Sequence, residues 1–260
     1  MGTGASIPFD RAAEYYDETR GLSEDAVAWQ TRLLADELRG RGRVLEAGVG
    51  TGQVALPLAE AGIAMTGLDL SRPMLDRLIA KAGGRIPFPL VLGDATRLPF
   101  PDDVFGGAVL RWVLHLVPAW RRLLAELVRV VEPGGVAVLQ VGGYGGRRAE
   151  IQERFGEVAG IPHVPAGLMW GATEELDDAM RGLGATVRLL PTFREEGRGS
   201  LEGYLRALED SRYSWTWKAD PDLVRRAAAE VRAWAEERWG PLAEVPEDPH
   251  EVAWRAYDLG

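Results

Sequence analysis

The chain has 260 residues, of which 39 are acidic and 30 basic, and a formal charge of −9. With 46% hydrophobic and 27% charged residues, its composition is typical of a globular protein with a sizeable core. The absence of cysteine excludes disulfides, thiolate zinc sites, iron–sulfur clusters and thiolate nucleophiles. The acidic balance disfavours nucleic-acid binding, because phosphate contacts need a positive surface.

The opening of the chain carries no recognisable targeting signal. Residues 1–20 contain no apolar stretch after a basic start, and no later segment approaches the run of about 20 apolar residues that a membrane-spanning helix needs. From these patterns we expect a cytoplasmic protein without a membrane span.

Two helices and then a strand–helix alternation are predicted for the first half of the chain. The first helix covers residues 9–19, and Ser23 is the expected N-cap of the second. From Arg43, near-continuous apolar strands alternate with helices, which favours a parallel sheet covered on both faces and an α/β fold. The strands are expected at 44–47, 63–69, 88–92, 104–110 and 135–141, and the helices at 51–61, from Ser71 onward and at 119–131.

The second half is less regular. Helices are predicted at 147–159, 173–182, 201–209 and 222–239, and strands at 185–190 and 252–257. No linker rich in Pro, Gly or Ser separates a second domain, so we predict a single domain over 1–260. Its expected parts are an N-terminal helical lid (1–40), a core (41–142), helical insertions with a sixth strand (143–250) and a final strand (251–260).

A glycine-rich turn follows the first predicted strand. Residues 44–52 read VLEAGVGTG, and glycines at alternate positions allow a tight turn and the close approach of a ligand. Asp69 ends the second strand, where an acid can accept from ribose hydroxyls, and Asp94 follows the third. Because ligands bind beyond the carboxyl ends of parallel strands, these groups predict a site for a nucleoside-containing cofactor.

Three details of the sequence narrow the choice of cofactor. The dinucleotide fingerprint requires a glycine at position 53, which is Gln53, and no Gly-Lys-Ser/Thr follows the turn. Glu46 would repel a pyrophosphate and suits a ligand that carries an amine.

The motifs, taken in order, resemble those of class I S-adenosylmethionine-dependent methyltransferases. They are EAGVGTG at 46–52, Asp69, GDA at 93–95 followed by LPF at 98–100, and RVVEPGG at 129–135. Within this superfamily the chain is most similar to the small-molecule group that includes the ubiquinone/menaquinone-biosynthesis methyltransferases, over roughly residues 9–142. The resemblance implies S-adenosyl-L-methionine as cofactor and a doubly wound, mostly parallel seven-stranded sheet, Rossmann-like, with helical lid insertions.

The resemblance also implies which residues contact the cofactor. Gly48 and Gly50 would border its methionyl part, Glu46 its ammonium and Asp69 its ribose. The remaining implied contacts are Tyr16 and Arg20 over the carboxylate, Leu70 and Met74 at the adenine, Asp94 and Ala95 at the adenine amino group, and Arg111 at the methionyl end.

His115 follows the fourth predicted strand, at the mouth of the crevice. It is the candidate general base, because its unperturbed pKa lies near neutrality, although it could equally cap a turn or line the pocket. The other two histidines lack a partner at metal-ligand spacing, so we predict no metal site. The aromatic residues expected to line an apolar acceptor pocket are Tyr144, Trp170, Trp215 and Trp217.

The absence of two sequence features narrows the class of acceptor molecule. No Asn/Asp-Pro-Pro-Tyr/Phe tetrapeptide follows the fourth strand, and no cysteine can attack a pyrimidine. We therefore predict an enzyme that transfers the methyl group to an oxygen, carbon or nitrogen of a small molecule by in-line displacement. Two alternatives stay open: an NAD-dependent oxidoreductase or epimerase, disfavoured by Gln53 and the lack of a Tyr-x-x-x-Lys pair, and a non-catalytic S-adenosylmethionine-binding regulatory protein.

Overall fold

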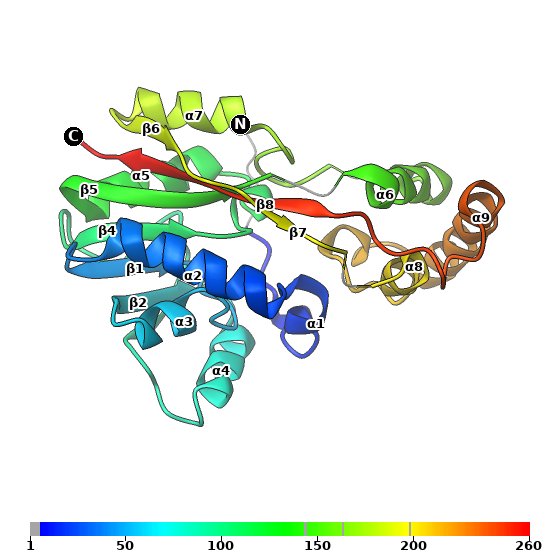
Figure 1. The fold of residues 1–260 in the computed structure, drawn as a ribbon, viewed down its shortest axis with the longest axis horizontal. Coiled ribbons are helices and arrows are strands. Elements are labelled where there is room, and N and C mark those ends of the chain that lie inside the picture. The colour runs from blue at the N-terminus through cyan, green and yellow to red at the C-terminus, as the bar shows by residue number, and fades with distance from the viewer. Residues whose placement is uncertain (1–5, 143–144, 163, 198) are drawn as a thin grey trace. The chain divides into compact units, whose positions relative to one another are not determined.

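The structure is a computed structural model that describes residues 6–142, 145–162, 164–197 and 199–260. The chain divides into two compact units, whose elements are labelled in Figure 1. Unit 1 comprises Met1–Gly142, Ala166–Phe193 and Val252–Gly260, and unit 2 comprises Gly143–Pro165 and Arg194–Glu251.

The central sheet has eight strands and is mostly parallel. Its order is β3-β2-β1-β4-β5-β8-β6, and the short β7 pairs with β8 beside this path. Strands β1 to β5 run parallel, whereas β8 is antiparallel to both β5 and β6. The predicted α/β fold is therefore confirmed, with β7 as an additional strand. The strands are β1 (Arg43–Ala47), β2 (Ala64–Asp69), β3 (Leu90–Leu92), β4 (Phe105–Leu110), β5 (Val131–Val141), β6 (Thr186–Leu189), β7 (Phe193–Glu195) and β8 (His250–Asp258).

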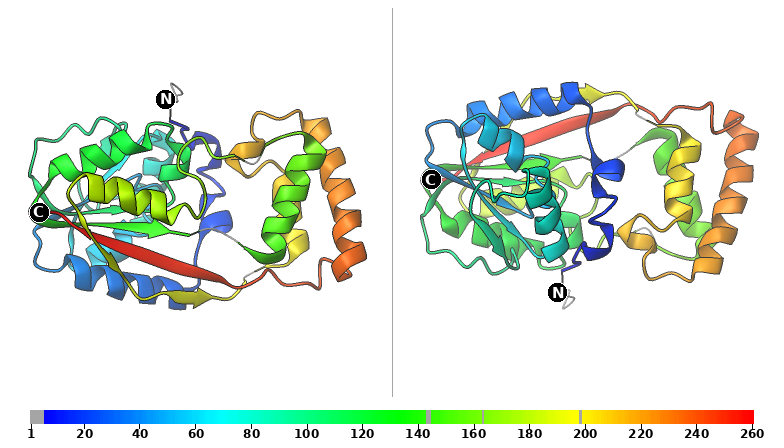
Figure 2. Two further views of the ribbon diagram at one scale, coloured as in Figure 1. Left: turned by 90° about the horizontal axis from the view of Figure 1, so that it is seen from above. Right: turned by 90° about the horizontal axis from the view of Figure 1, so that it is seen from below.

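Helices cover both faces of the sheet because successive strand residues point to opposite sides. Val44 and Val109 enter one core, and their neighbours Leu45 and Leu110 enter the other. Figures 1 and 2 show the two helical layers around the strands. The first core is covered by α2 (Glu24–Leu38), α3 (Ala55–Glu60) and α4 (Arg72–Lys81), and the second by α5 (Trp120–Val130) and α7 (Thr173–Gly182).

The predicted helix starts are confirmed where a side chain caps them. Ser23 Oγ accepts the N–H of Ala26 at 3.1 Å, and Ser71 Oγ accepts that of Met74 at 3.3 Å. The helix predicted at 51–61 begins later, at Ala55, because Gly52 still belongs to the turn, with φ of +79°.

The helix predicted at 9–19 is wrong as a continuous element. The segment forms η1 (Asp10–Ala12) and then α1 (Tyr16–Arg20), because Tyr15 between them has φ −114° and ψ 7°, outside the helical region.

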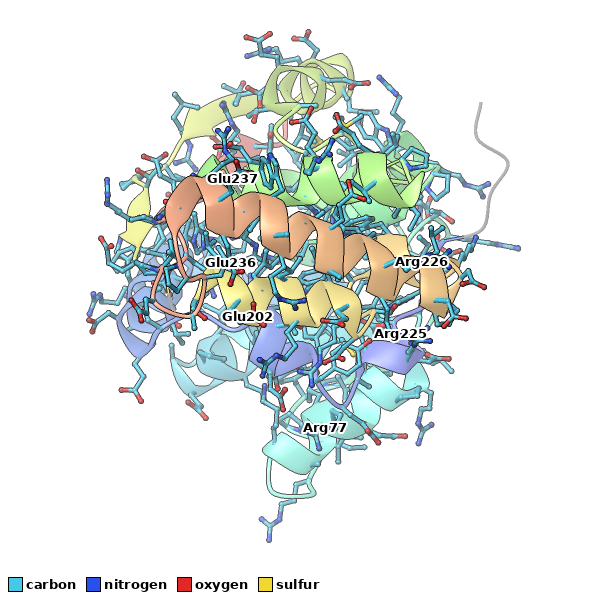
Figure 3. All side chains as sticks on the ribbon, turned by 90° about the vertical axis from the view of Figure 1, so that its right-hand side faces the viewer. Arg77, Glu202, Arg225, Arg226, Glu236 and Glu237 are labelled. Carbon is cyan, nitrogen blue, oxygen red and sulfur yellow. The ribbon has the colours of Figure 1, made fainter. Side chains whose placement is uncertain are left out.

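Unit 2 is a small helical assembly with a core of its own. Phe155, Tyr204 and Val231 are among its buried side chains. Figure 3 shows labelled charged residues along the outer side of its longest helix, with Arg225 near one end and Glu237 near the other, and both are exposed. Its elements are α6 (Gly146–Ala159), α8 (Leu201–Glu209), η3 (Ser214–Thr216) and α9 (Pro221–Trp239).

In the described part of the chain, none of the helices combines the length and the apolar character needed to cross a bilayer.

Candidate active site

The glycine turn after β1 is fixed by the end of β2. The backbone N–H groups of Gly48 and Val49 both donate to the carbonyl of Leu68, at 2.7 and 2.9 Å. Gly48 has φ of +76°, and a Cβ there would lie 2.4 Å from Cγ2 of Val113. Only glycine fits this position, because Val113 fills the space of a Cβ and the backbone is left-handed.

Asp69 holds the same turn from the end of β2. Its Oδ2 accepts the N–H of Gly50 at 2.7 Å, and its Oδ1 accepts the N–H of Ser71 at 2.8 Å. Burial raises the pKa of Asp69, and these backbone donors oppose that effect. Because a carboxylate has about four lone-pair sites, Asp69 can still accept from the hydroxyl groups of a ligand.

A cleft lies at the carboxyl ends of these strands, and we call it the donor cleft. Its volume, about 620 Å³ including the solvent it opens to, is within the range of small-molecule sites. Ser6 to Phe9 and Trp112 also border it. Nine of the eleven residues predicted to contact a cofactor line the donor cleft: Tyr16, Gly48, Gly50, Asp69, Leu70, Met74, Asp94, Ala95 and Arg111.

The other two predicted residues, Glu46 and Arg20, are not among the described lining residues. Glu46 lies in β1 and is 2% exposed, and its Oε2 has no hydrogen-bond partner in the described structure. Burial raises the pKa of Glu46 to about 8, against the charge of Arg111. A buried acid with one oxygen left without a partner suits a cationic ligand group such as an ammonium.

Asp94 is oriented by the residue two positions further on. Its Oδ1 accepts the backbone N–H of Thr96 at 2.8 Å and the Thr96 hydroxyl at 2.9 Å. The Oδ2 atom takes part in neither bond, so it can accept from a ligand N–H in the donor cleft.

The N-terminal segment is attached to the glycine turn through Asp17. Its Oδ1 accepts from Thr51 Oγ1 at 2.6 Å and from Gln53 Nε2 at 2.8 Å, and its Oδ2 pairs with Lys81 Nζ at 3.0 Å. Although burial alone would raise the pKa of Asp17, these hydrogen bonds hold it below the ordinary value. The segment that carries Tyr16 is thereby held beside the donor cleft.

Arg111, at the end of β4, is hydrogen-bonded to the glycine turn, to β5 and to the N-terminal segment. It donates through Nε to Gln140 Oε1 at 2.9 Å, through Nη1 to Gln53 Oε1, and through Nη2 to the carbonyl of Arg20 at 3.2 Å. Gln53, which breaks the dinucleotide fingerprint, thus links Asp17 to Arg111. The part of Arg20 that Arg111 contacts is its backbone.

A second cavity adjoins the same strand ends, and we call it the tryptophan pocket. It is lined by aromatic, aliphatic and a few uncharged polar residues, including Trp112, His115, Gln140, Leu168, Trp170 and Thr173. The ring centroids of His115 and Trp170 are 3.8 Å apart, and the two ring planes are inclined by 37°. The ring centroids of Trp112 and Trp170 are 5.8 Å apart. The structure therefore brings two of the predicted residues, His115 and Trp170, into one pocket.

Backbone hydrogen bonds hold His115 and Trp170 together. His115 lies in η2 (Leu114–Leu116), and its carbonyl accepts the N–H of Gly167 at 2.9 Å. Leu168 N–H donates to the carbonyl of Leu114 at 3.0 Å. The loop that carries Trp170 is therefore attached to the turn that carries His115.

Trp112 borders both the donor cleft and the tryptophan pocket. Its φ of +56° is left-handed, which is uncommon for a bulky side chain and costs about 1–3 kcal/mol. Such a conformation persists only where surrounding contacts hold it, and it places an indole between the two cavities.

Two of the remaining predicted pocket residues, Trp215 and Trp217, are not among the described lining residues of the tryptophan pocket. Trp215 belongs to unit 2, where its ring meets Phe155 edge-on at 5.6 Å, and Trp217 directly follows η3 of the same unit. Tyr144 lies outside the described residues. Sequence reasoning missed Trp112 and Gln140, although a polar residue at the end of the apolar strand β5 was a usable indication of the latter.

Comparison with known proteins agrees with this geometry. Residues 45–139 match the family model described as "Methyltransferase domain". This segment is a class I S-adenosylmethionine-dependent methyltransferase domain. The match begins within β1 and ends within β5, and it includes the glycine turn, Asp69, Asp94 and Arg111. It supports the methyltransferase interpretation and not the oxidoreductase alternative.

Curated relatives of the chain are methyltransferases. The chain is 37% identical over 134 residues to a demethylmenaquinone methyltransferase of Streptomyces avermitilis, covering 50% of this chain and 57% of that protein. It is 33% identical over 170 residues to a malonyl-[acyl-carrier protein] O-methyltransferase of Serratia marcescens, covering 62% and 60%. The chain thus spans little more than half the length of these relatives.

Solved structures with low sequence identity share the fold. A putative methyltransferase from an antibiotic biosynthesis pathway of Anabaena variabilis superposes with a TM-score of 0.64 at 17% identity, covering 90% of this chain and 97% of that one.

Proposed function

We propose that the whole protein is an S-adenosylmethionine-dependent methyltransferase that acts on a small-molecule acceptor. The observation that carries this proposal is Glu46, a buried carboxyl group whose Oε2 has no partner at the glycine turn. The cofactor's α-ammonium would supply the missing hydrogen bonds, while Asp69 and Asp94 would receive its ribose and adenine. The cofactor supplies an electrophilic methyl group, and the acceptor would bind in the tryptophan pocket.

The protein's contribution to such a reaction is alignment and exclusion of water. In-line displacement needs the acceptor atom behind the methyl carbon, and positioning of this kind can lower a barrier by about 7–11 kcal/mol. Trp112, between the two cavities, and Arg111, which ties Gln140 to Gln53, are placed to hold the two reactants in register.

A small acceptor is favoured over nucleic acid. The formal charge of −9 opposes association with a phosphate backbone. The tryptophan pocket itself is lined by described residues without a single Lys or Arg side chain.

We further propose two lids, which are the N-terminal segment and unit 2 with its Trp215 and Trp217. We also propose that the protein works in the cytoplasm.

Calorimetry with S-adenosylhomocysteine tests the cofactor assignment. We expect binding at pH 7 with release of a proton from Glu46, seen as a heat that depends on the ionisation enthalpy of the buffer. Glu46→Gln should bind more weakly and without that dependence. NAD serves as the negative control. Absence of S-adenosylhomocysteine binding to the intact protein would overturn the proposal.

A second measurement separates an enzyme from a regulatory protein. Labelled S-adenosylmethionine is incubated with an extract of small metabolites, and labelled products are counted. Transfer of label identifies an enzyme, whereas cofactor binding without transfer to any metabolite favours the regulatory alternative.

A further inference from the structure

The tryptophan pocket has a composition that restricts what can enter it. Among its described lining residues there is no Asp, Glu, Lys or Arg, and its walls are formed mainly by indole rings and aliphatic side chains. A cationic ligand group would lose its hydration there without gaining a counter-charge. Flat aromatic ligands fit such walls, because stacked or edge-on rings gain about 0.5–1.5 kcal/mol beyond the burial of their area.

Gln140 gives the pocket a hydrogen-bond donor. Its Oε1 accepts from Arg111 Nε at 2.9 Å. Because arginine has donors only, the amide oxygen of Gln140 must face Arg111, and this settles which end of the amide is the nitrogen. The NH₂ group is then the donor that Gln140, which lines the tryptophan pocket, can offer to a ligand.

The charge behind Gln140 also selects the ligand. Arg111 is a buried cation whose positive charge reaches the pocket through its hydrogen bond to Gln140. This charge disfavours a cationic amine and stabilises the negative charge that a hydroxyl oxygen acquires when it loses its proton. His115, fixed against Trp170, is the titratable side chain among the described residues of this lining.

We propose that the tryptophan pocket takes a planar, uncharged aromatic acceptor that carries a hydroxyl group, with Gln140 as the residue that selects oxygen. This inference rests on the proposed function and names its acceptor class. Gln140 donates an N–H to the hydroxyl oxygen, and the imidazole of His115 takes the hydroxyl proton. The oxygen forms a bond to the methyl carbon while the carbon–sulfur bond breaks, its electron pair staying on sulfur to give S-adenosylhomocysteine.

Binding of three probes in the presence of saturating S-adenosylhomocysteine tests the acceptor class without relying on turnover. 2-Naphthol is planar and carries a hydroxyl, 2-naphthylmethylamine is a cation of similar size, and cyclohexanol has a hydroxyl but no flat ring. We expect 2-naphthol to bind at least about tenfold more tightly than either comparison probe. Equal or tighter binding of the amine would overturn the proposal.

Two variants test the residues. Gln140→Glu keeps an oxygen toward Arg111 but replaces the donor with an acceptor, so 2-naphthol affinity should fall about tenfold or more. Trp170→Leu should weaken 2-naphthol similarly, whereas Trp170→Phe, which keeps a flat ring, should lose much less. Gln152→Glu, in unit 2, controls for the added charge. Unchanged 2-naphthol affinity in both Gln140→Glu and Trp170→Leu would overturn the assignment.

The readouts keep this inference separate from the proposed function. S-adenosylhomocysteine affinity is measured for every variant alongside 2-naphthol affinity. If the wild-type protein binds S-adenosylhomocysteine but not 2-naphthol, the acceptor class is wrong and the proposed function stands. If it binds neither, the proposed function itself falls. If Gln140→Glu weakens S-adenosylhomocysteine binding through Arg111, the 2-naphthol affinities of Trp170→Leu and Trp170→Phe decide the assignment.

Discussion

Asp69 Oδ2 accepts the backbone N–H of Gly50 at 2.7 Å, which joins the end of β2 to the glycine turn after β1. The two features that indicated a nucleoside site are therefore one physical unit. The acid orients the turn, and the turn keeps the acid facing the donor cleft. A ligand that binds there meets a preformed arrangement and pays little for ordering it.

Replacement of Asp69 should lower cofactor affinity sharply. Asp69→Ala removes the acceptor for ligand hydroxyls and for Gly50, and hydrogen bonds to a charged group are worth about 1.5–3 kcal/mol each. We therefore expect S-adenosylhomocysteine to bind at least about tenfold more weakly by calorimetry. Circular dichroism should show an intact fold, and the exposed acid Asp76→Ala serves as control. Unchanged affinity would contradict the role of Asp69.

Glu46 should make stability depend on pH. Its pKa is about 8 in the folded protein and near 4.5 in the unfolded chain, so between these values the folded state holds one more proton. Stability then falls as pH rises through this window, with a slope of at most about 1.4 kcal/mol per pH unit. Glu46→Gln lacks this proton. Between pH 5 and pH 8 its free energy of unfolding should therefore fall less steeply than that of the wild-type protein, with a difference in slope of at most about 1.4 kcal/mol per pH unit.

Urea denaturation of the ligand-free protein at several pH values measures this effect. The exposed Glu132→Gln is the matched control, and its profile should run parallel to that of the wild-type protein. A parallel profile for Glu46→Gln as well would show that Glu46 does not carry the excess proton.

Loss of His115 should slow methyl transfer without weakening cofactor binding. General base catalysis typically contributes about 10²–10⁴-fold to a rate, so His115→Ala should lower kcat by that order with an acceptor that must lose a proton. His115 lines the tryptophan pocket and not the donor cleft, so affinity for S-adenosylhomocysteine should be retained. A kcat within twofold of wild type, about 0.4 kcal/mol, would assign His115 to packing against Trp170.

Gly167 should be required for the contact between the Trp170 loop and η2. An added Cβ would lie 2.0 Å from the carbonyl oxygen of Leu114, so the loop must move. We expect Gly167→Ala to lower the free energy of unfolding by about 1–3 kcal/mol and to weaken 2-naphthol binding. Gly182→Ala, at the end of α7 with open space around it, is the control and should cost little. Equal stability of the two variants would contradict the close approach.

The order of strands and helices followed from local patterns in the sequence. The apolar strands, the caps Ser23 and Ser71 and the glycines at 48 and 50 each depend on residues close in the chain, so they could be recognised without the fold. The same holds for Asp69 and Asp94, because the end of a parallel strand is already a position at the ligand-binding edge. The predicted helix at 9–19 failed before Tyr16, because the backbone of Tyr15 is not helical.

The partnerships between distant segments came from the tertiary structure alone. Asp17 meets Thr51, Gln140 meets Arg111, and His115 meets Trp170 only because strands β1, β4 and β5 lie side by side and loops close over their ends. Sequence periodicity reports which face of an element is buried, but not which side chain across the crevice it will meet. The sequence thus identified a methyl-donor site, while the pocket for the acceptor emerged from contacts between residues dozens of positions apart.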